Sequence, residues 1–185
     1  MRRHCEKRSD EAISSFFRRG LMICILIICA TGFCFSPDES FAALTNADKV
    51  LVLKSKRVMT LLRKGRVLKT YKIALGKQPV GKKICAGDKR TPEGEYVVDC
   101  RKTDSKYHLA LHVSYPNEKD IRNADNLGLS PGGNIMIHGL PDGYEDVDEF
   151  HRITDWTDGC IAVTNEEMEE MWELVPDGTP IEIKP

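Results

Sequence analysis

The sequence lacks an uncharged apolar run long enough to span a membrane on its own. The uncharged apolar run Gly20–Phe35 has only 16 residues, whereas a transmembrane helix needs about 20. The run directly follows Arg18 and Arg19, and a short apolar core with a basic flank is typical of a secretory signal peptide. We therefore predict that the rest of the chain is exported.

The segment after this run contains a candidate cleavage site. Ser40 and Ala42 place small residues at the two positions that a signal peptidase reads, and we predict cleavage after Ala42. The alternative is an uncleaved anchor in the inner membrane. Residues 1–42 are accordingly predicted to be a signal peptide or an N-terminal membrane anchor. Residues 43–185 are predicted to form one domain in the periplasm or cell envelope.

Motifs for metal catalysis and for nucleic-acid binding are missing as well. There is no H-E-x-x-H stretch and no interleaving of arginines with aromatic residues. His108 and His112 are four residues apart, which would suit a metal on a helix. However, Tyr107–Val113 alternates like a strand, where residues four apart lie about 13 Å from each other. We therefore expect no metal, no cofactor and no nucleic-acid partner.

The charge is balanced overall but unevenly distributed. The chain has 27 Lys and Arg against 28 Asp and Glu. Asp48–Lys106 contains 17 basic and six acidic residues, whereas Gly139–Glu173 contains 12 acidic residues and one basic residue, Arg152. One interpretation is that the two stretches form solvated faces that attract one another within the fold. The other is that the basic stretch meets a substrate that carries carboxylates.

Alternating apolar residues predict a domain that is mostly β (α+β), with one or two short helices. The predicted strands cover residues 49–54, 57–62, 67–75, 95–101, 107–114 and 179–184. The predicted helices cover residues 117–127 and 165–174.

Two further short apolar runs each adjoin a reactive side chain. Ile135–Ile137 ends at His138, and Ile161–Val163 begins directly after Cys160. Two such strands can place an imidazole beside a thiol on one sheet edge, where the imidazole takes the proton or stabilises the thiolate. Gly159 fits, because a residue without Cβ lets the backbone N–H approach a developing oxyanion. The alternative is a buried structural cysteine and a structural histidine.

Five stretches, taken together, resemble the L,D-transpeptidase family, whose catalytic domain is of the YkuD type. In that family an I-x-I-H-G strand is followed, after a loop, by (S/T)-H-G-C and an apolar residue. The matching stretches are Ile135–Gly139, Thr157–Ile161, Gly87–Tyr96 with its T-P-x-G-x-Y turn, Leu111–Asn117 and Pro131–Gly133. The resemblance extends over residues 47–183, nearly the whole predicted mature chain.

The resemblance implies a YkuD-like β-sandwich of mixed sheets and an L,D-transpeptidase that acts on peptidoglycan stem peptides. It makes Cys160 the nucleophile and His138 its base. It also implies that the carbonyl of Gly139 orients the imidazole and that backbone N–H groups near Asp158, Gly159 and Cys160 form an oxyanion hole. The residues that it places in a substrate pocket are Thr157, His112 and Tyr115.

The chain departs from the family pattern at positions that contact substrate. Asp158 stands where the family has His, and Ala162 stands where it has Asn or Arg. Two other functions therefore stay open. Water could resolve the same acyl-enzyme, which would make the protein an L,D-carboxypeptidase or amidase. Alternatively, Asp158 marks lost activity, and the domain only binds the cell wall.

The cysteines leave one pairing open. Four of the seven lie in the predicted targeting segment, and the predicted mature chain retains Cys85, Cys100 and Cys160. An odd number leaves one thiol unpaired. The alternatives are a disulfide between Cys85 and Cys100, worth about 3 kcal/mol through the loop that it closes, and two reduced core thiols.

Overall fold

The computed structural model describes residues 46–141, 143–144 and 151–185. The predicted signal peptide or anchor, residues 1–42, and its predicted cleavage position lie outside these ranges. Within them, no helix combines the length and the apolar character needed to cross a membrane.

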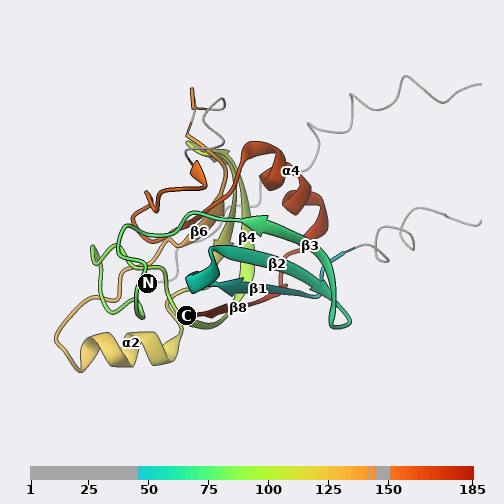
Figure 1. Ribbon diagram of the computed structural model, residues 1–185. Helices are drawn as coiled ribbons and strands as arrows, with labels where there is room; N and C mark the ends of the chain where they lie inside the picture. The colour runs from blue at the N-terminus through green and yellow to red at the C-terminus, as the bar shows by residue number, and fades with distance from the viewer. Residues whose placement is uncertain (1–45, 142, 145–150) are drawn as a thin grey trace, which may run out of the picture. The chain divides into compact units, whose positions relative to one another are not determined.

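The described part of the chain contains eight strands and two α-helices (Figure 1). The strands are β1 (Lys49–Leu53), β2 (Val58–Arg63), β3 (Arg66–Lys72), β4 (Gly94–Ser105), β5 (His108–Val113), β6 (Met136–His138), β7 (Ile161–Ala162) and β8 (Pro180–Lys184). The α-helices are α2 (Glu118–Asp125) and α4 (Asn165–Leu174), and a short 3-10 helix is η1 (Lys54–Lys56). The predicted strands and helices are all present, so the mostly β (α+β) fold class is confirmed.

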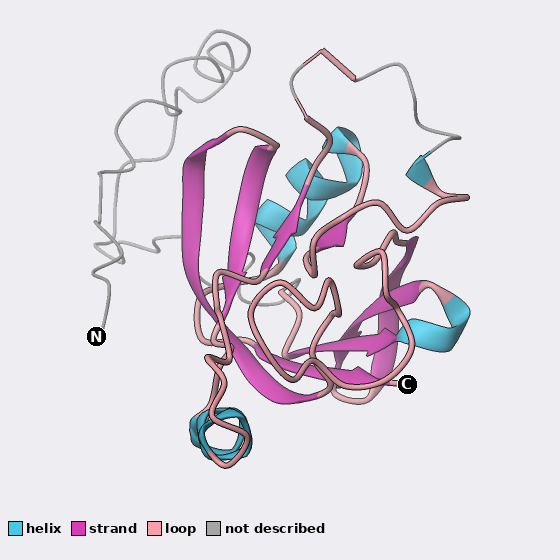
Figure 2. Ribbon diagram, turned by 90° about the vertical axis from the view of Figure 1, so that its left-hand side faces the viewer, coloured by secondary structure: helices cyan, strands magenta, loops and turns pink. Residues whose placement is uncertain are grey.

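The eight strands form one mixed β-sheet, in which some neighbouring strands are parallel and others antiparallel. Their order is β3-β2-β1-β8-β4-β5-β6-β7. The pairs β1–β8 and β6–β7 are parallel, and the other pairs are antiparallel. The long strand β4 belongs to both halves, because its first residues pair with β8 and its later residues pair with β5. Irregular register within β4 marks the change of direction between the two halves (Figure 2).

Strand β3 ends three residues earlier than predicted. The chain beyond it leaves β2 and finds new partners. Ala74 forms an isolated bridge with Ala162, and Gly76 forms one with Thr157. The alternating pattern continues through this change of partner, which is why the sequence alone predicted one longer strand. As a result, the chain after β3 reaches the segment that carries Cys160.

A single hydrophobic cluster joins the two halves of the sheet. Alternate residues of β1, β2, β4, β5 and β8 point into it, as the period of two requires. The helix α4 adds Met168 and Met171, both fully buried. The strand residues of the cluster include Val50, Val52, Met59, Leu61, Leu111, Val113, Ile137, Ile161, Ile181 and Ile183.

Both helices begin with a capping box. The Thr164 hydroxyl accepts a hydrogen bond from the Glu167 N–H, and the Glu167 carboxylate accepts one from the Thr164 N–H. Asn117 and Asp120 make the same reciprocal pair at α2. The helix α4 packs on the strands, whereas α2 lies apart from them, seen end-on at the bottom of Figure 2. The cap at Thr164 places Asn165, the first residue of α4, next to the end of β6.

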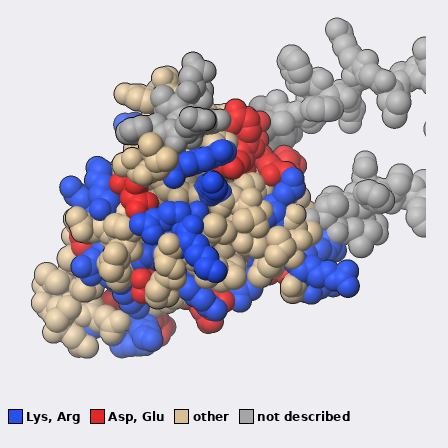
Figure 3. Space-filling model, viewed as in Figure 1, with Lys and Arg blue, Asp and Glu red and all other residues tan. Residues whose placement is uncertain are grey.

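Ion pairs connect the basic stretch with the acidic stretch. Arg57 pairs with Asp155 at 2.7 Å, and Lys69 pairs with Glu170 at 2.5 Å. In Figure 3, basic side chains gather across the centre of the face shown, and acidic side chains gather over α4. These contacts support the interpretation that the two stretches attract one another.

The burial of the core predicts that two substitutions in the β2–β3 hairpin differ greatly in their effect on the free energy of unfolding. Leu61→Ala, at a fully buried position, should reduce the free energy of unfolding by about 2–5 kcal/mol, because it removes apolar contacts and leaves a cavity. Val67→Ala, at a position 63% exposed, should change it by less than about 0.5 kcal/mol. Urea unfolding of the two variants measures both values. Equal losses would contradict the assignment of the core.

Candidate active site

The pairing of β6 with β7 places His138 and Cys160 on one face of the sheet. Ile137 pairs with Ile161, and His138 pairs with Ala162, so Cys160 lies opposite Met136. Paired residues share a face, as do residues two apart on one strand. The Cα atoms of His138 and Cys160 are therefore one strand and two residues apart, about 8 Å.

The imidazole of His138 is buried and neutral. Its side chain is buried, and its Nδ1 lies 2.8 Å from the carbonyl oxygen of Gly139. Because a carbonyl only accepts, Nδ1 carries the proton and Nε2 keeps its lone pair. Burial lowers the pKa of His138 from 6.5 to about 4, against a smaller raising effect of the Gly139 carbonyl. The ring is therefore uncharged at neutral pH, and the Gly139 carbonyl, which was predicted to orient it, is its hydrogen-bond partner.

The segment after His138 is clamped between β5 and α4. The Gly139 N–H donates to the carbonyl oxygens of Tyr107 and Leu109, at 3.1 and 3.3 Å. The Leu140 N–H donates to the Asn165 side-chain oxygen at 2.8 Å. A Cβ at Gly139 would lie 2.4 Å from that oxygen, so only glycine fits. The sequence marked Asn165 as part of a helix start and did not reveal this contact.

An aromatic cluster surrounds the imidazole. The Tyr107 ring lies 4.4 Å from the His138 ring, and the Trp156 ring lies 5.7 Å from it, measured between centroids. The Trp156 Nε1–H donates to His151 Nδ1 at 3.3 Å. His151 is buried as well, and burial lowers its pKa to about 4. Sequence reasoning missed all three neighbours, because no motif or spacing relates them to His138.

The thiol of Cys160 is protonated at rest. Burial is the main cause that raises its pKa above 9.0, and Asp158 adds to the effect. The backbone N–H of Met136 and the ammonium of Lys83 act in the opposite direction. The Sγ atom lies 3.8 Å from the carbonyl oxygen of Asn134. The resting pair is therefore a neutral thiol and a neutral imidazole, and the thiolate forms only when a base removes the proton.

The turn before Cys160 is held by Thr157. Its hydroxyl donates to the Cys160 carbonyl at 2.8 Å and accepts from the Gly159 N–H at 3.1 Å. Its backbone pairs with Leu75 and Lys77 on the chain that follows β3. Thr157 is buried, so it braces the turn, although it was predicted to line the pocket. The N–H of Gly159, a predicted oxyanion donor, is engaged by Thr157 in this structure.

A second contact docks the same turn onto the body of the domain. The Asp155 carboxylate accepts from Arg57 Nη2 at 2.7 Å and from the Leu75 N–H at 3.0 Å. A carboxylate that bonds both a guanidinium and a backbone N–H is a strong anchor. Sequence reasoning missed this pair, because Arg57 and Asp155 are far apart in the chain.

Asp158 lies at the surface of the domain. Its side chain is 77% exposed and pairs with Lys77 at 3.2 Å. An exposed pair of this kind contributes little stability. Asp158 acts on the site through its charge, which raises the pKa of Cys160.

Of the two remaining residues that were predicted to line the pocket, His112 lies on the face of the candidate site and Tyr115 lies in the core. His112 pairs with Met136 in the β5–β6 register, so it shares the face of His138 and Cys160, and its Nδ1 lies 2.5 Å from Asp99. Tyr115 is instead buried in the core, where its hydroxyl donates to the carbonyl of Pro131. In the described residues, no group of three or more His, Cys, Asp or Glu side chains is placed to hold a metal ion.

The disulfide considered between Cys85 and Cys100 is not formed. Cys85 is a free thiol, and so is Cys160. Cys100 is disulfide-bonded, but not to Cys85. Cys85 lies in the loop after β3, where its N–H donates to Asp88, whereas Cys100 lies within β4. Their nearness in the sequence therefore did not indicate pairing.

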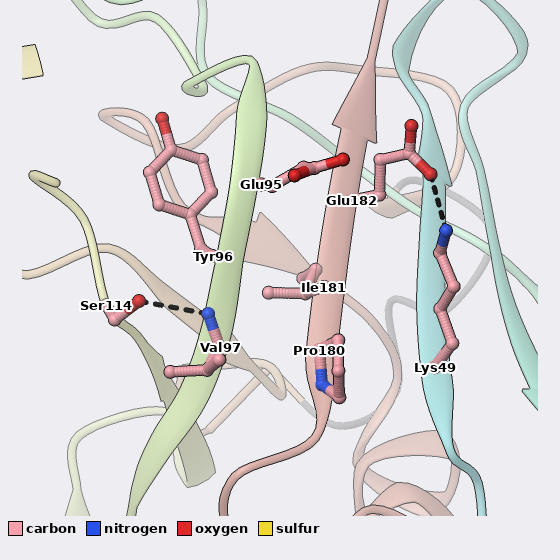
Figure 4. A pocket seen from close by; sticks show the side chains of 8 residues that line it. All are labelled: Lys49, Glu95, Tyr96, Val97, Ser114, Pro180, Ile181 and Glu182. Atoms are coloured by element: carbon pink, nitrogen blue, oxygen red, sulfur yellow. Dashed lines mark hydrogen bonds and ion pairs between the residues drawn. The ribbon is translucent and has the colours of Figure 1, made fainter. Parts of the chain in front are cut away.

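A cavity of about 500 Å³ lies away from His138 and Cys160 (Figure 4). It is bordered by strands β1, β8 and β4, and Lys49 and Glu182 form an ion pair across its edge. None of the residues that carry the proposed chemistry lines it. The lining residues are Lys49, Glu95, Tyr96, Val97, Ser114, Pro180, Ile181 and Glu182.

The two buried histidines predict a loss of stability in mild acid. An unfolded histidine is protonated below about pH 6.5, but burial keeps folded His138 and His151 neutral down to about pH 4. The free energy of unfolding should therefore fall as the pH decreases from 7 to 5. His138 should contribute about 2 kcal/mol of this loss. Urea unfolding at the two pH values tests this, and His138→Gln should lose part of the dependence.

The backbone conformation at Gly159 predicts that a side chain at this position destabilises the fold. Gly159 has φ +131°, and a Cβ would lie 2.8 Å from the Arg90 carbonyl oxygen. Gly159→Ala should therefore cost about 1–3 kcal/mol of stability. Gly133→Ala is the control, because the nearest atom to a Cβ there is 3.8 Å away. Similar unfolding free energies for both variants would contradict the geometry of the turn.

Comparison with known proteins agrees with the resemblance found in the sequence. YafK of Escherichia coli K12 is 29% identical over 132 residues, which are 68% of this chain and 46% of YafK. The helical cell shape determining protein Pgp2 of Campylobacter jejuni (K307A mutant) is 26% identical, with a TM-score of 0.58 over 75% of this chain and 47% of Pgp2. Bd1075 of Bdellovibrio bacteriovorus, 24% identical with a TM-score of 0.53 over 77% of this chain and 49% of its own, shares the fold.

This chain thus spans about half the length of the relatives that it matches. The family model for the YkuD L,D-transpeptidase catalytic domain matches residues 47–183. That range includes the whole sheet except Lys184, the last residue of β8, and it includes His138 and Cys160. The chain therefore belongs to the YkuD family of L,D-transpeptidase catalytic domains.

Proposed function

We propose that the protein is an exported cysteine enzyme that acts as an L,D-transpeptidase on peptidoglycan stem peptides. The observation that carries this proposal is the shared face of Cys160 and His138, with a neutral imidazole whose Nε2 keeps its lone pair. A thiol beside such a base is the minimal apparatus for attack on a carbonyl. Membership of the L,D-transpeptidase family supports peptidoglycan as the material acted upon.

The reaction proceeds in two halves. In the first, Cys160 Sγ bonds to the carbonyl carbon of a diamino acid in the donor stem, while His138 Nε2 takes the thiol proton. The C–N bond then breaks, His138 returns the proton to the leaving amine, and the terminal D-amino acid departs. In the second half, an acceptor amine attacks the thioester and loses a proton to His138. The new amide forms, and the thiol is restored.

The neighbours of the pair suit this sequence of proton transfers. The clamp on Gly139 holds the carbonyl that fixes the His138 tautomer. A fixed tautomer matters, because the same nitrogen must take the proton and return it. The turn stabilised by Thr157 holds Cys160 at the start of β7. We therefore assign catalysis to Cys160 and His138, and the orientation of His138 to Gly139.

The proposed location is the cell envelope, where peptidoglycan lies. It rests on the predicted export of residues 43–185 and on the family. The similar protein Pgp2 is a determinant of helical cell shape, which supports a role for this chain in wall cross-linking or remodelling. Water in place of the acceptor amine would turn the same apparatus into a carboxypeptidase or amidase, since the first half of the reaction is unchanged.

The proposal predicts a product that depends on Cys160. The intact chain is incubated with a disaccharide-tetrapeptide, and the products are analysed by mass spectrometry. The wild type should give a dimer with loss of one D-Ala, and Cys160→Ala should give none. His138→Gln should slow the reaction by about 10²–10⁴-fold, because it removes the base.

The other outcomes separate the alternatives. Loss of D-Ala without a dimer would identify a hydrolase. If neither the wild type nor Cys160→Ala changes the substrate, while both retain binding to isolated peptidoglycan, the domain is a wall-binding module. Circular dichroism of each variant shows whether an inactive protein is still folded.

A further inference from the structure

Trp156 connects the turn that carries Cys160 with the imidazole of His138. It lies in that turn, before Thr157. Its indole packs against the His138 ring, with 5.7 Å between the centroids and 68° between the ring planes. An edge-to-face contact of this kind is a favoured geometry for two aromatic rings. The indole therefore joins the segment of the nucleophile to the side chain that we assign as its base.

The backbone on either side of Trp156 is fixed. The preceding residue, Asp155, accepts hydrogen bonds from Arg57 at 2.7 Å and from the Leu75 N–H at 3.0 Å. The following residue, Thr157, donates its N–H to the Leu75 carbonyl at 3.1 Å. Because both neighbours are tied to other parts of the chain, the position of the indole depends on the rotation of its own side chain.

A hydrogen bond to His151 fixes that rotation. Trp156 Nε1–H donates to His151 Nδ1 at 3.3 Å, and an indole nitrogen can only donate. Burial lowers the pKa of His151 to about 4, so its ring is neutral at pH 7 and carries one proton, on Nε2. His138 has its proton on Nδ1, which faces the Gly139 carbonyl. The two buried histidines therefore have opposite tautomers.

The proton on His151 Nε2 has no hydrogen-bond partner among the described residues. A buried donor without a partner is costly, and an apolar side chain would fill the same space without that cost. Packing alone therefore does not account for a histidine at this position. The feature that histidine supplies is the acceptor nitrogen that faces Trp156.

Tyr107 is a second aromatic contact of the imidazole. Its ring lies 4.4 Å from the His138 ring, with 36° between the planes, and 6.2 Å from the Trp156 ring. The Tyr107 carbonyl also accepts the Gly139 N–H at 3.1 Å. The two rings and the Gly139 carbonyl together hold the imidazole in one orientation. Of these contacts, the Trp156 ring is the one that belongs to the turn of the nucleophile.

We propose that Trp156 is a positioning residue, held by His151, that fixes the His138 imidazole relative to the turn that carries Cys160. As a role in catalysis, this rests on the proposed function, because it acts through the base. The effect on the orientation and tautomer of His138 does not, because it exists without substrate. Neither Trp156 nor His151 is assigned a contact with the reacting carbonyl.

The first measurement is the tautomer of each histidine at pH 7, read from the ring nitrogen chemical shifts of the intact, isotope-labelled chain. In the wild type, His138 should be protonated on Nδ1 and His151 on Nε2. Trp156→Phe removes the indole N–H and replaces the indole by a smaller ring. His138 in this variant should be a mixture of both tautomers, because its ring is no longer confined.

His151→Asn and His151→Leu form a matched pair. The two side chains are similar in size and shape, but only asparagine keeps an acceptor near the position of Nδ1. His151→Leu should disturb the His138 tautomer and lower kcat by about 10–100-fold with little change in KM, because a misplaced base slows the chemical step. His151→Asn should remain near the wild type. In the Trp156→Phe background, His151→Leu should add nothing, since the bond that it breaks is already absent.

Trp172→Phe is the control for a general loss of aromatic packing. Trp172 is the other of the chain's two tryptophans. It lies on α4, where its ring is 5.1 Å from the guanidinium carbon of Arg101. The substitution should leave both tautomers and kcat near the wild type.

Three results would overturn the proposal. One is a pure Nδ1–H tautomer of His138 with a wild-type kcat in both folded Trp156→Phe and folded His151→Leu. Another is an equal loss in His151→Asn and His151→Leu, which would show that the acceptor nitrogen has no role. The third is an equal loss in Trp172→Phe. Thermal unfolding identifies any variant that fails to fold. The tautomers are measured without peptidoglycan, so an inactive wild type would count against the proposed function and not against the positioning of His138.

Discussion

The parallel pairing of β6 and β7 is the constraint on which the rest of the candidate site depends. It places His138 beside Ala162 and Cys160 opposite Met136, and thus both reactive side chains on one face. A slip of one residue would turn one of them to the other face, where Ile137 and Ile161 form the core. Ile137 and Ile161, which adjoin the two reactive residues and are buried in the core, therefore fix the register. The same register packs the core and places His138 and Cys160 on one face.

Burial shifts the pKa values of His138 and Cys160 in opposite directions. It lowers the pKa of His138, so that the imidazole is neutral, and it raises the pKa of Cys160, so that the thiol keeps its proton. The two shifts together disfavour a resting ion pair. The Lys83 ammonium and the Met136 N–H oppose the second shift. Both groups therefore favour the thiolate over the thiol, against the effect of burial.

Contacts between distant parts of the chain hold the site in place. Asp155 ties the turn before Cys160 to Arg57 and to the Leu75 N–H. Asn165, at the start of α4, fixes the chain after His138. Each contact satisfies a backbone N–H that would otherwise be buried without a partner. The early strands and the last helix consequently contribute to a site whose reactive residues both lie between them in sequence.

The sequence by itself determined the strands, the two helices and the positions of His138 and Cys160 beside two short apolar runs, because periodicity and local turn chemistry depend on near neighbours. The shorter β3 and the bracing role of Thr157 came only from the tertiary structure, as did the burial of Tyr115. The same holds for the free thiol of Cys85 and for the contact between Trp156 and His138, which no motif in the sequence indicated. Each of these depends on which distant segment packs against the residue, and no local pattern encodes that partner.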